Sequence, residues 1–75
     1  MSEAIAIINI RSHPVTGLSV SWHVIEKETG EVVRDYAFSR YSFEIVQSIN
    51  EVMGEIINVC NEFDLRLTDI KMDRR

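Results

Sequence analysis

Residues 42–63, SFEIVQSINEVMGEIINVCNEF, decide the fold because their apolar side chains recur with the period of an α-helix. At about 100° per residue these side chains fill a sector of about 160°, wide enough to cover a small sheet. Ser42 is expected to cap a helix of about 20 residues. The apolar face comprises Ile45, Val46, Ile49, Val52, Met53, Ile56, Ile57, Val59, Cys60 and Phe63.

The sequence before this helix predicts three strands. Residues 4–10 form a short isoleucine-rich run, typical of a strand that is buried on both faces and central in its sheet. Residues 13–17 are turn-forming, and residues 18–24 then alternate apolar and polar side chains, which predicts a strand with one buried face. Residues 28–30 predict a hairpin turn that leads into a third strand at residues 32–38.

A final strand is predicted after the helix from Leu65, Leu67 and Ile70, with a slip of the alternation at Thr68 and Asp69 that we interpret as a β-bulge. The order β-β-β-α-β indicates an α+β fold, in which one long amphipathic helix packs on one face of a small antiparallel or mixed sheet. A right-handed crossover should place the last strand beside the first strand and parallel to it. We expect residues 1–75 to form a single α+β domain.

Composition narrows the classes of function. The chain has a net charge of −4, which argues against broad electrostatic attraction to nucleic acid. No apolar run approaches the roughly 20 residues that span a bilayer, and the N-terminal residues lack the basic region of a secretory signal, so a cytoplasmic location is expected. Cys60 lies on the apolar helix face and is expected to be a small buried side chain.

An acidic line is the most organised feature of the helix. It consists of four glutamates that fall within about 20° of one line, on the side opposite the apolar face, and no Lys or Arg lies between Tyr41 and Phe63. The line is interpreted either as the solvated face of an acidic protein or as a docking surface for a partner with a basic surface. Its members are Glu44, Glu51, Glu55 and Glu62.

The leading hypothesis is a small non-enzymatic protein-binding module of the inhibitor, antitoxin or adaptor type, and a phage origin would suit its size. The acidic line is the predicted partner-binding site, and His23 and Arg34 on the exposed side of the sheet form a second, weaker surface. Gly54 inside the helix is either tolerated drift or a point of close approach to a second copy, and we expect a homodimer. We expect no cofactor or metal, since His13 and His23 lack the spaced ligands that zinc requires.

Two alternatives remain open at this stage. Arg34, Tyr36, Arg40 and Tyr41 mix aromatic and basic side chains, a combination that can stack the bases of single-stranded nucleic acid. The more remote alternative is a nuclease-like domain that depends on Mg²⁺. This alternative comes from a resemblance of topology.

The order β-β-β-α-β resembles the first half of the ribonuclease-H-like fold. In that family, carboxylates on the first strand, early in the helix and at the end of the fourth strand hold two divalent metal ions. Glu44 matches the helix position and Asp69 the fourth-strand position, whereas the first strand offers Asn9, or Arg11 on an acid-x-acid pattern. An amide binds Mg²⁺ more weakly than a carboxylate does, and an arginine repels it. The resemblance therefore implies the shape of the family without its chemistry.

Antitoxins of the HicB type are similar to such a partial ribonuclease-H-like domain, in which the sheet and helix bind a toxin. This chain lacks the glycine-rich segment between strands and the appended DNA-binding module of those antitoxins. The resemblance implies a protein partner and rests on topology.

Overall fold

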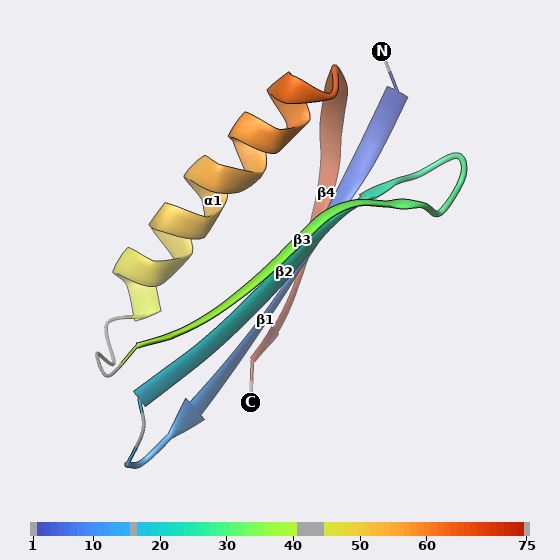
Figure 1. Ribbon diagram of the computed structural model, residues 1–75. Helices are drawn as coiled ribbons and strands as arrows, with labels where there is room; N and C mark the ends of the chain where they lie inside the picture. Colours follow the sequence, from blue (N-terminus) through green and yellow to red (C-terminus); the bar gives the residue numbers. More distant parts are fainter. Residues whose placement is uncertain (1, 16, 41–44, 75) are drawn as a thin grey trace.

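The computed structural model describes residues 2–15, 17–40 and 45–74. Within these residues the elements follow in the order β-β-β-α-β, which confirms the predicted α+β fold (Figure 1). Ser42 and Glu44, predicted to begin the helix and its acidic line, lie outside the described residues. The elements are β1 (Ser2–His13), β2 (Gly17–Glu26), β3 (Val32–Arg40), α1 (Ile45–Glu62) and β4 (Leu65–Arg74).

The four strands form one mixed sheet in the order β3-β2-β1-β4. The β1–β2 and β2–β3 pairs are antiparallel, and β4 is parallel to β1. The predicted central position of β1 and the predicted parallel neighbour are both confirmed. α1 lies along one face of the sheet, so we refer to the other face as the open face (Figure 1). Within the described residues, no helix is long and apolar enough to cross a membrane.

β1 is buried on one face, and the prediction that both faces are buried is wrong. Its even-numbered residues from Ala4 to Ile10 are at most 1% exposed, whereas Ile5, Ile7 and Asn9 on the open face are only partly buried. Among the described residues, a helix covers one side of the sheet alone. The isoleucine-rich run therefore reflects a central position in the sheet.

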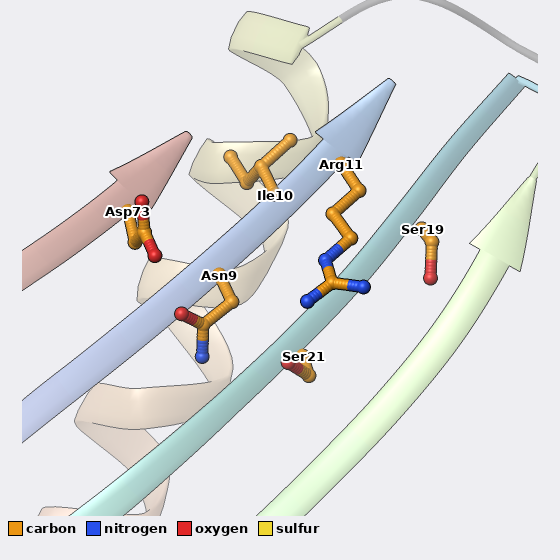
Figure 2. Close-up of a pocket in the computed structure, with 6 residues that line it drawn as sticks. All are labelled: Asn9, Ile10, Arg11, Ser19, Ser21 and Asp73. Atoms are coloured by element: carbon orange, nitrogen blue, oxygen red, sulfur yellow. The ribbon is translucent and has the colours of Figure 1, made fainter. Parts of the chain in front are cut away.

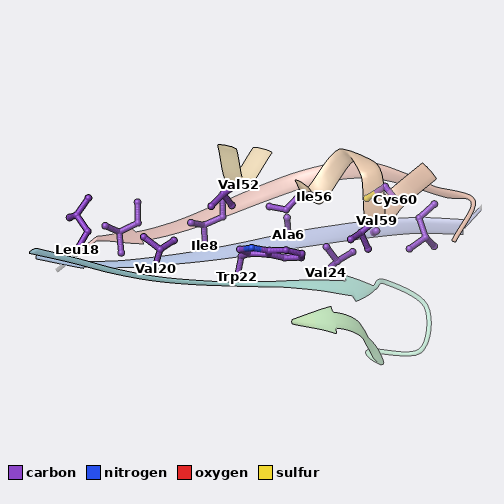
Figure 3. Close-up of a cluster of buried hydrophobic side chains, with 13 residues drawn as sticks. Ala6, Ile8, Leu18, Val20, Trp22, Val24, Val52, Ile56, Val59 and Cys60 are labelled. Atoms are coloured by element: carbon purple, nitrogen blue, oxygen red, sulfur yellow. The ribbon is translucent and has the colours of Figure 1, made fainter. Parts of the chain in front are cut away.

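The core lies between α1 and the sheet (Figure 3). Ala4 and Ala6 are fully buried in β1, while Trp22 fills the space above β2 and is 3% exposed. Cys60 is 4% exposed, which confirms it as a buried side chain, and burial raises the pKa of its thiol. The core residues are Ala4, Ala6, Ile8, Ile10, Leu18, Val20, Trp22, Val24, Val52, Ile56, Val59, Cys60 and Leu65.

The predicted β-bulge in the last strand is confirmed at Thr68. Ala4 pairs with Leu67, but the next residue, Ile5, pairs with Asp69, so Thr68 is the extra residue. The Thr68 hydroxyl donates to the Ala4 carbonyl oxygen over 3.3 Å. The bulge changes the face on which the following side chains lie.

α1 buries only part of its predicted apolar face. Val52 and Ile56 are fully buried, whereas Val46 is 74% and Ile57 is 49% exposed. Ser48 is buried as well, so the buried sector is displaced toward the glutamates. The helix is therefore turned about its axis relative to the prediction, and Glu55 and Glu62 flank the sheet instead of lying opposite it.

Gly54 is exposed on α1, and a Cβ atom added there would meet no atom of the described residues within 4 Å. The packing within the chain therefore gives no reason for a glycine at this position.

Glu3 connects three segments at one end of the sheet. Its carboxylate accepts a hydrogen bond from Arg66 of β4 at 2.9 Å and forms an ion pair with Lys27 at 3.4 Å. The hydrogen bonds from Arg66 and then Lys27 hold the pKa of Glu3 below its ordinary value of 4.5. All three side chains are exposed, so the effect on stability is small.

A pH-dependent contribution of Glu3 is expected. Because its pKa is lowered by folding, the stabilisation is present above the ordinary value of 4.5 and is lost as the pH falls through the lowered value. Glu3→Gln should therefore lower the urea midpoint at about pH 7 and leave it unchanged once the pH is below the lowered pKa of Glu3. Glu28→Gln in the β2–β3 turn is the matched control. A difference between wild type and Glu3→Gln that persists at the lower pH would contradict the assignment.

Candidate functional site

A groove between α1 and β3 is the concave surface that contains the most predicted site residues. α1 contacts β2 and β4, the neighbours of β1 on its two sides, so the helix-facing side chains of the edge strand β3 remain accessible (Figure 1). The cavity has a volume of about 270 Å³. We call this surface the α1–β3 groove, and it is lined by Trp22, Arg34, Tyr36, Glu55, Asn58, Val59 and Glu62.

Aromatic rings form the sheet side of the α1–β3 groove. Tyr36 pairs with Trp22 in the β2–β3 ladder, and its ring centroid is 6.3 Å from that of Trp22. The ring centroid of Phe38, two residues further along β3, is also 6.3 Å from that of Tyr36. Trp22 is buried, but Tyr36 is 55% exposed. The Tyr36 ring is therefore held in place by neighbouring rings and is still available for contact.

Glu55 supplies a carboxylate on the helix side of the groove. Its Oε2 accepts a hydrogen bond from Trp22 Nε1 over 3.2 Å. A buried indole needs an acceptor for its N–H group, and here the helix provides one. The hydrogen bond fixes the position of the Glu55 carboxylate directly beside the aromatic rings.

Glu62 supplies a second carboxylate, seven residues or about two helical turns further along α1. Arg34 donates to both of its oxygens, over 3.1 and 3.4 Å, and the Arg34 guanidinium lies 5.4 Å from the ring centroid of Phe63. Both members of this ion pair are about half exposed. An exposed pair contributes only about 0–1 kcal/mol to stability. It can therefore open at little cost to the fold.

The structure brings together three of the six predicted site residues, namely Glu55, Glu62 and Arg34. Glu51 is exposed on α1 and does not line the groove, and Glu44 lies outside the described residues. His23 lies on the open face, where it pairs with Asp35 in the ladder. The placement of Arg34 beside His23 is corrected, because Arg34 pairs with buried Val24 and contacts the helix.

Asn58 and Val59 line the groove, although the sequence analysis did not select them for a site. The sequence does contain a signal for Asn58. Glu55, Asn58 and Glu62 are spaced at i, i+3 and i+7, so they lie on one flank of the helix. Val59 was assigned to the apolar face, and it contributes to both the core and the groove wall.

The positions matched to the ribonuclease-H-like family do not converge. Asn9 and Arg11 point away from α1 into a concavity of about 380 Å³ on the open face (Figure 2). Asp69 pairs with Ile5 in the ladder, whereas Asn9 pairs with Asp73. Within residues 2–15, 17–40 and 45–74, no group of three or more His, Cys, Asp or Glu side chains could hold a metal ion.

The aromatic and basic residues of the nucleic-acid hypothesis are divided in a similar way. Tyr36 lies in the α1–β3 groove, and Arg34 is bound to Glu62 at its end. Arg40 is the last residue of β3, and Tyr41 lies outside the described residues. Arg34 and Tyr36 therefore belong to a groove that also contains two carboxylates, and Arg40 does not line it.

Comparison with protein-family models, with curated proteins and with solved structures gave no match for this chain. Its class is accordingly defined by its own features: a small α+β domain in which a helix and an edge strand enclose an acidic groove with aromatic rings on its sheet side.

Proposed function

We propose that this chain is a non-enzymatic protein-binding module that docks a basic segment of a partner protein in the α1–β3 groove. The observation that carries the proposal is the convergence of an accessible aromatic ring, Tyr36, with the carboxylates of Glu55 and Glu62 in one groove. Inhibitors, antitoxins and adaptors all bind a partner protein, and the proposal covers these three roles.

A lysine or arginine side chain suits this groove. A cation over the face of Tyr36 gains a cation–π contact of about 0.5–2 kcal/mol. The Glu55 carboxylate, held by Trp22, and the Glu62 carboxylate lie on the helix side of the same groove. A partner arginine can also replace Arg34 at Glu62, because the exposed pair opens at little cost.

The edge of β3 provides a second means of recognition. β3 is the outermost strand, with β2 on one side. An extended segment that adds to such an edge forms backbone hydrogen bonds and places alternate side chains on the groove side. Main-chain pairing would supply affinity, and the acidic groove would select for basic side chains at alternate positions.

Replacement of the two groove carboxylates tests this proposal. Glu55→Gln/Glu62→Gln should lower the amount of partner that co-purifies from the source cells at low salt by about tenfold, because two charge-assisted contacts are lost. Glutamine still accepts the Trp22 N–H, so the fold should be retained. Glu28→Gln/Glu31→Gln in the exposed β2–β3 turn changes the net charge equally and is the matched control.

Retention of the partner by the control variant and its loss from the groove variant would support the proposal. Equal retention by both variants would overturn it. Equal loss from both would indicate attraction to the net negative charge alone, which would also overturn the proposed site.

A further inference from the structure

An apolar patch lies on the side of α1 opposite the groove. Val46, Met53 and Ile57 are on the flank of the helix that is turned away from the glutamates. Ile70 and Met72 pair with buried Ala6 and Ile8, so they lie on the helix-facing side of β4. Val46, Ile57, Ile70 and Met72 are 74%, 49%, 39% and 47% exposed. We call Val46, Met53, Ile57, Ile70 and Met72 the β4 patch.

β4 borders this patch and is the second edge of the sheet. It has ten residues and pairs with β1 on one side only. A long edge strand beside exposed apolar side chains is a surface on which another strand can add. The charges on β4 indicate which strand can add to this edge.

We infer that this edge binds a second copy of the chain, with two β4 strands antiparallel about a twofold axis at Ile70. In this register, Ile70 faces Ile70 of the other copy, and Asp69 faces the other copy's Lys71. Thr68 is the bulge and is left out of the ladder. Leu67 therefore faces Met72 of the other copy, and Arg66 faces Asp73 of the other copy. Among these pairs, those on the helix side are apolar and those on the open face join an acid to a base. The next pair outward, Leu65 with Arg74, joins an apolar side chain to a basic one at the end of the ladder.

The bulge at Thr68 is what makes β4 complementary to itself. It places Leu67 on the helix side although Asp69 is on the open face, and the alternation before and after it therefore matches across the axis. Moving the axis by one residue, to Lys71, would set Lys71 against Lys71 and Asp69 against Asp73. Like charges directly opposite each other destabilise a strand pair.

The dimensions also suit a second copy. α1 packs over β1, whose helix-facing residues from Ala4 to Ile10 are at most 1% exposed. In the paired sheet two such helices would be three strand spacings apart, which is about 14 Å. Helices with side chains are about 10–12 Å in diameter. The exposed side chains of the two β4 patches would therefore occupy the gap between the helices.

In the single chain, the Ile70 N–H donates to Asp69 Oδ1 over 2.9 Å. This local hydrogen bond satisfies a backbone group in the middle of the edge. Pairing would exchange it for contacts across the axis and would direct the Asp69 carboxylate toward Lys71 of the other copy. The inference concerns a different surface from the α1–β3 groove and does not depend on the proposed function.

Sedimentation equilibrium tests the inference. Wild-type protein at about 100 μM should have twice the chain mass of 8.7 kDa, since interfaces of ordinary size dissociate at about 1 μM or below. Ile70→Glu should give the monomer mass, because it puts two carboxylates together on the axis. Val15→Glu, at an apolar residue that is 80% exposed in the β1–β2 turn, is the control and should remain dimeric.

A charge swap tests the register. Lys71→Asp places two carboxylates opposite each other twice in the dimer and should weaken dimerisation by about tenfold or more. The double variant Asp69→Lys/Lys71→Asp restores opposite charges in the same register and should recover the dimer. Far-UV circular dichroism of each variant checks that the chain is folded.

A wild-type monomer at about 100 μM would overturn the inference. So would a dimer whose dissociation constant is unchanged by Ile70→Glu, because the contact would then lie elsewhere. A dimer that is weakened by Lys71→Asp and is not recovered by the charge swap would overturn the proposed register.

Discussion

Trp22→Ala is expected to lose most of its folded population. Trp22 is 3% exposed, its ring is next to Tyr36, and it belongs to the core beneath α1. Truncating a buried tryptophan to alanine costs about 3–5 kcal/mol. A domain below about 80 residues rarely gains more than about 3–5 kcal/mol from its core. Far-UV circular dichroism with and without urea measures the loss.

Trp22→Phe separates the two roles of this residue. Phenylalanine retains most of the buried ring but cannot donate to Glu55, so a smaller cost of about 2 kcal/mol is expected. If Trp22→Ala and Trp22→Phe have the same urea midpoint, the packing described for Trp22 is wrong.

Ile56→Ala is expected to lower the free energy of unfolding by about 2–5 kcal/mol. Ile56 is fully buried against the sheet, whereas Ile57, the next residue, is 49% exposed. Ile57→Ala is therefore a matched control and should cost less than about 1 kcal/mol. Urea unfolding at low protein concentration, where self-association does not contribute, measures both values.

Similar losses for Ile56→Ala and Ile57→Ala would contradict the helix orientation. They would indicate that the whole apolar arc of α1 is buried, as the sequence pattern alone suggests. The glutamates would then lie opposite the sheet, and the α1–β3 groove would not form as described.

The strands and their order could be predicted because the signals are local. Alternation in β2 identified its buried face, and a break in alternation located the bulge at Thr68. The parallel arrangement of β4 and β1 followed from the crossover rule. Each of these features depends on neighbouring residues or on chain topology.

The burial of β1 and the rotation of α1 could not be predicted in the same way. An isoleucine-rich run does not indicate whether a second layer covers Ile5 and Ile7. The width of an apolar helix face likewise does not show which part of it meets the sheet. Ser48 on α1 is buried, and Glu55 and Glu62 on the same flank contact side chains of β2 and β3. This packing depends on contacts between α1 and the sheet, which the apolar periodicity of either element does not indicate.

The candidate site was predicted in part. Helical spacing predicted Glu55 and Glu62 as site residues, but as members of one exposed line with Glu51 and Glu44. In the structure, Glu55 and Glu62 have partners on β2 and β3. Their contacts with Trp22 and Arg34 depend on residues 33 and 28 positions away in the chain. Helical spacing alone cannot reveal such pairs.

Photo-crosslinking from β3 tests the central claim, that the α1–β3 groove binds a partner protein. A photoreactive amino acid replaces Tyr36, which lies in the groove, or Ala37, the next residue, which is exposed on the open face. Each variant is irradiated in the source cells, and far-UV circular dichroism of the purified variants checks the fold. If the groove binds a partner, we expect a crosslinked partner protein from position 36 and none from position 37. Crosslinking from position 37 alone, or from neither position, would contradict it.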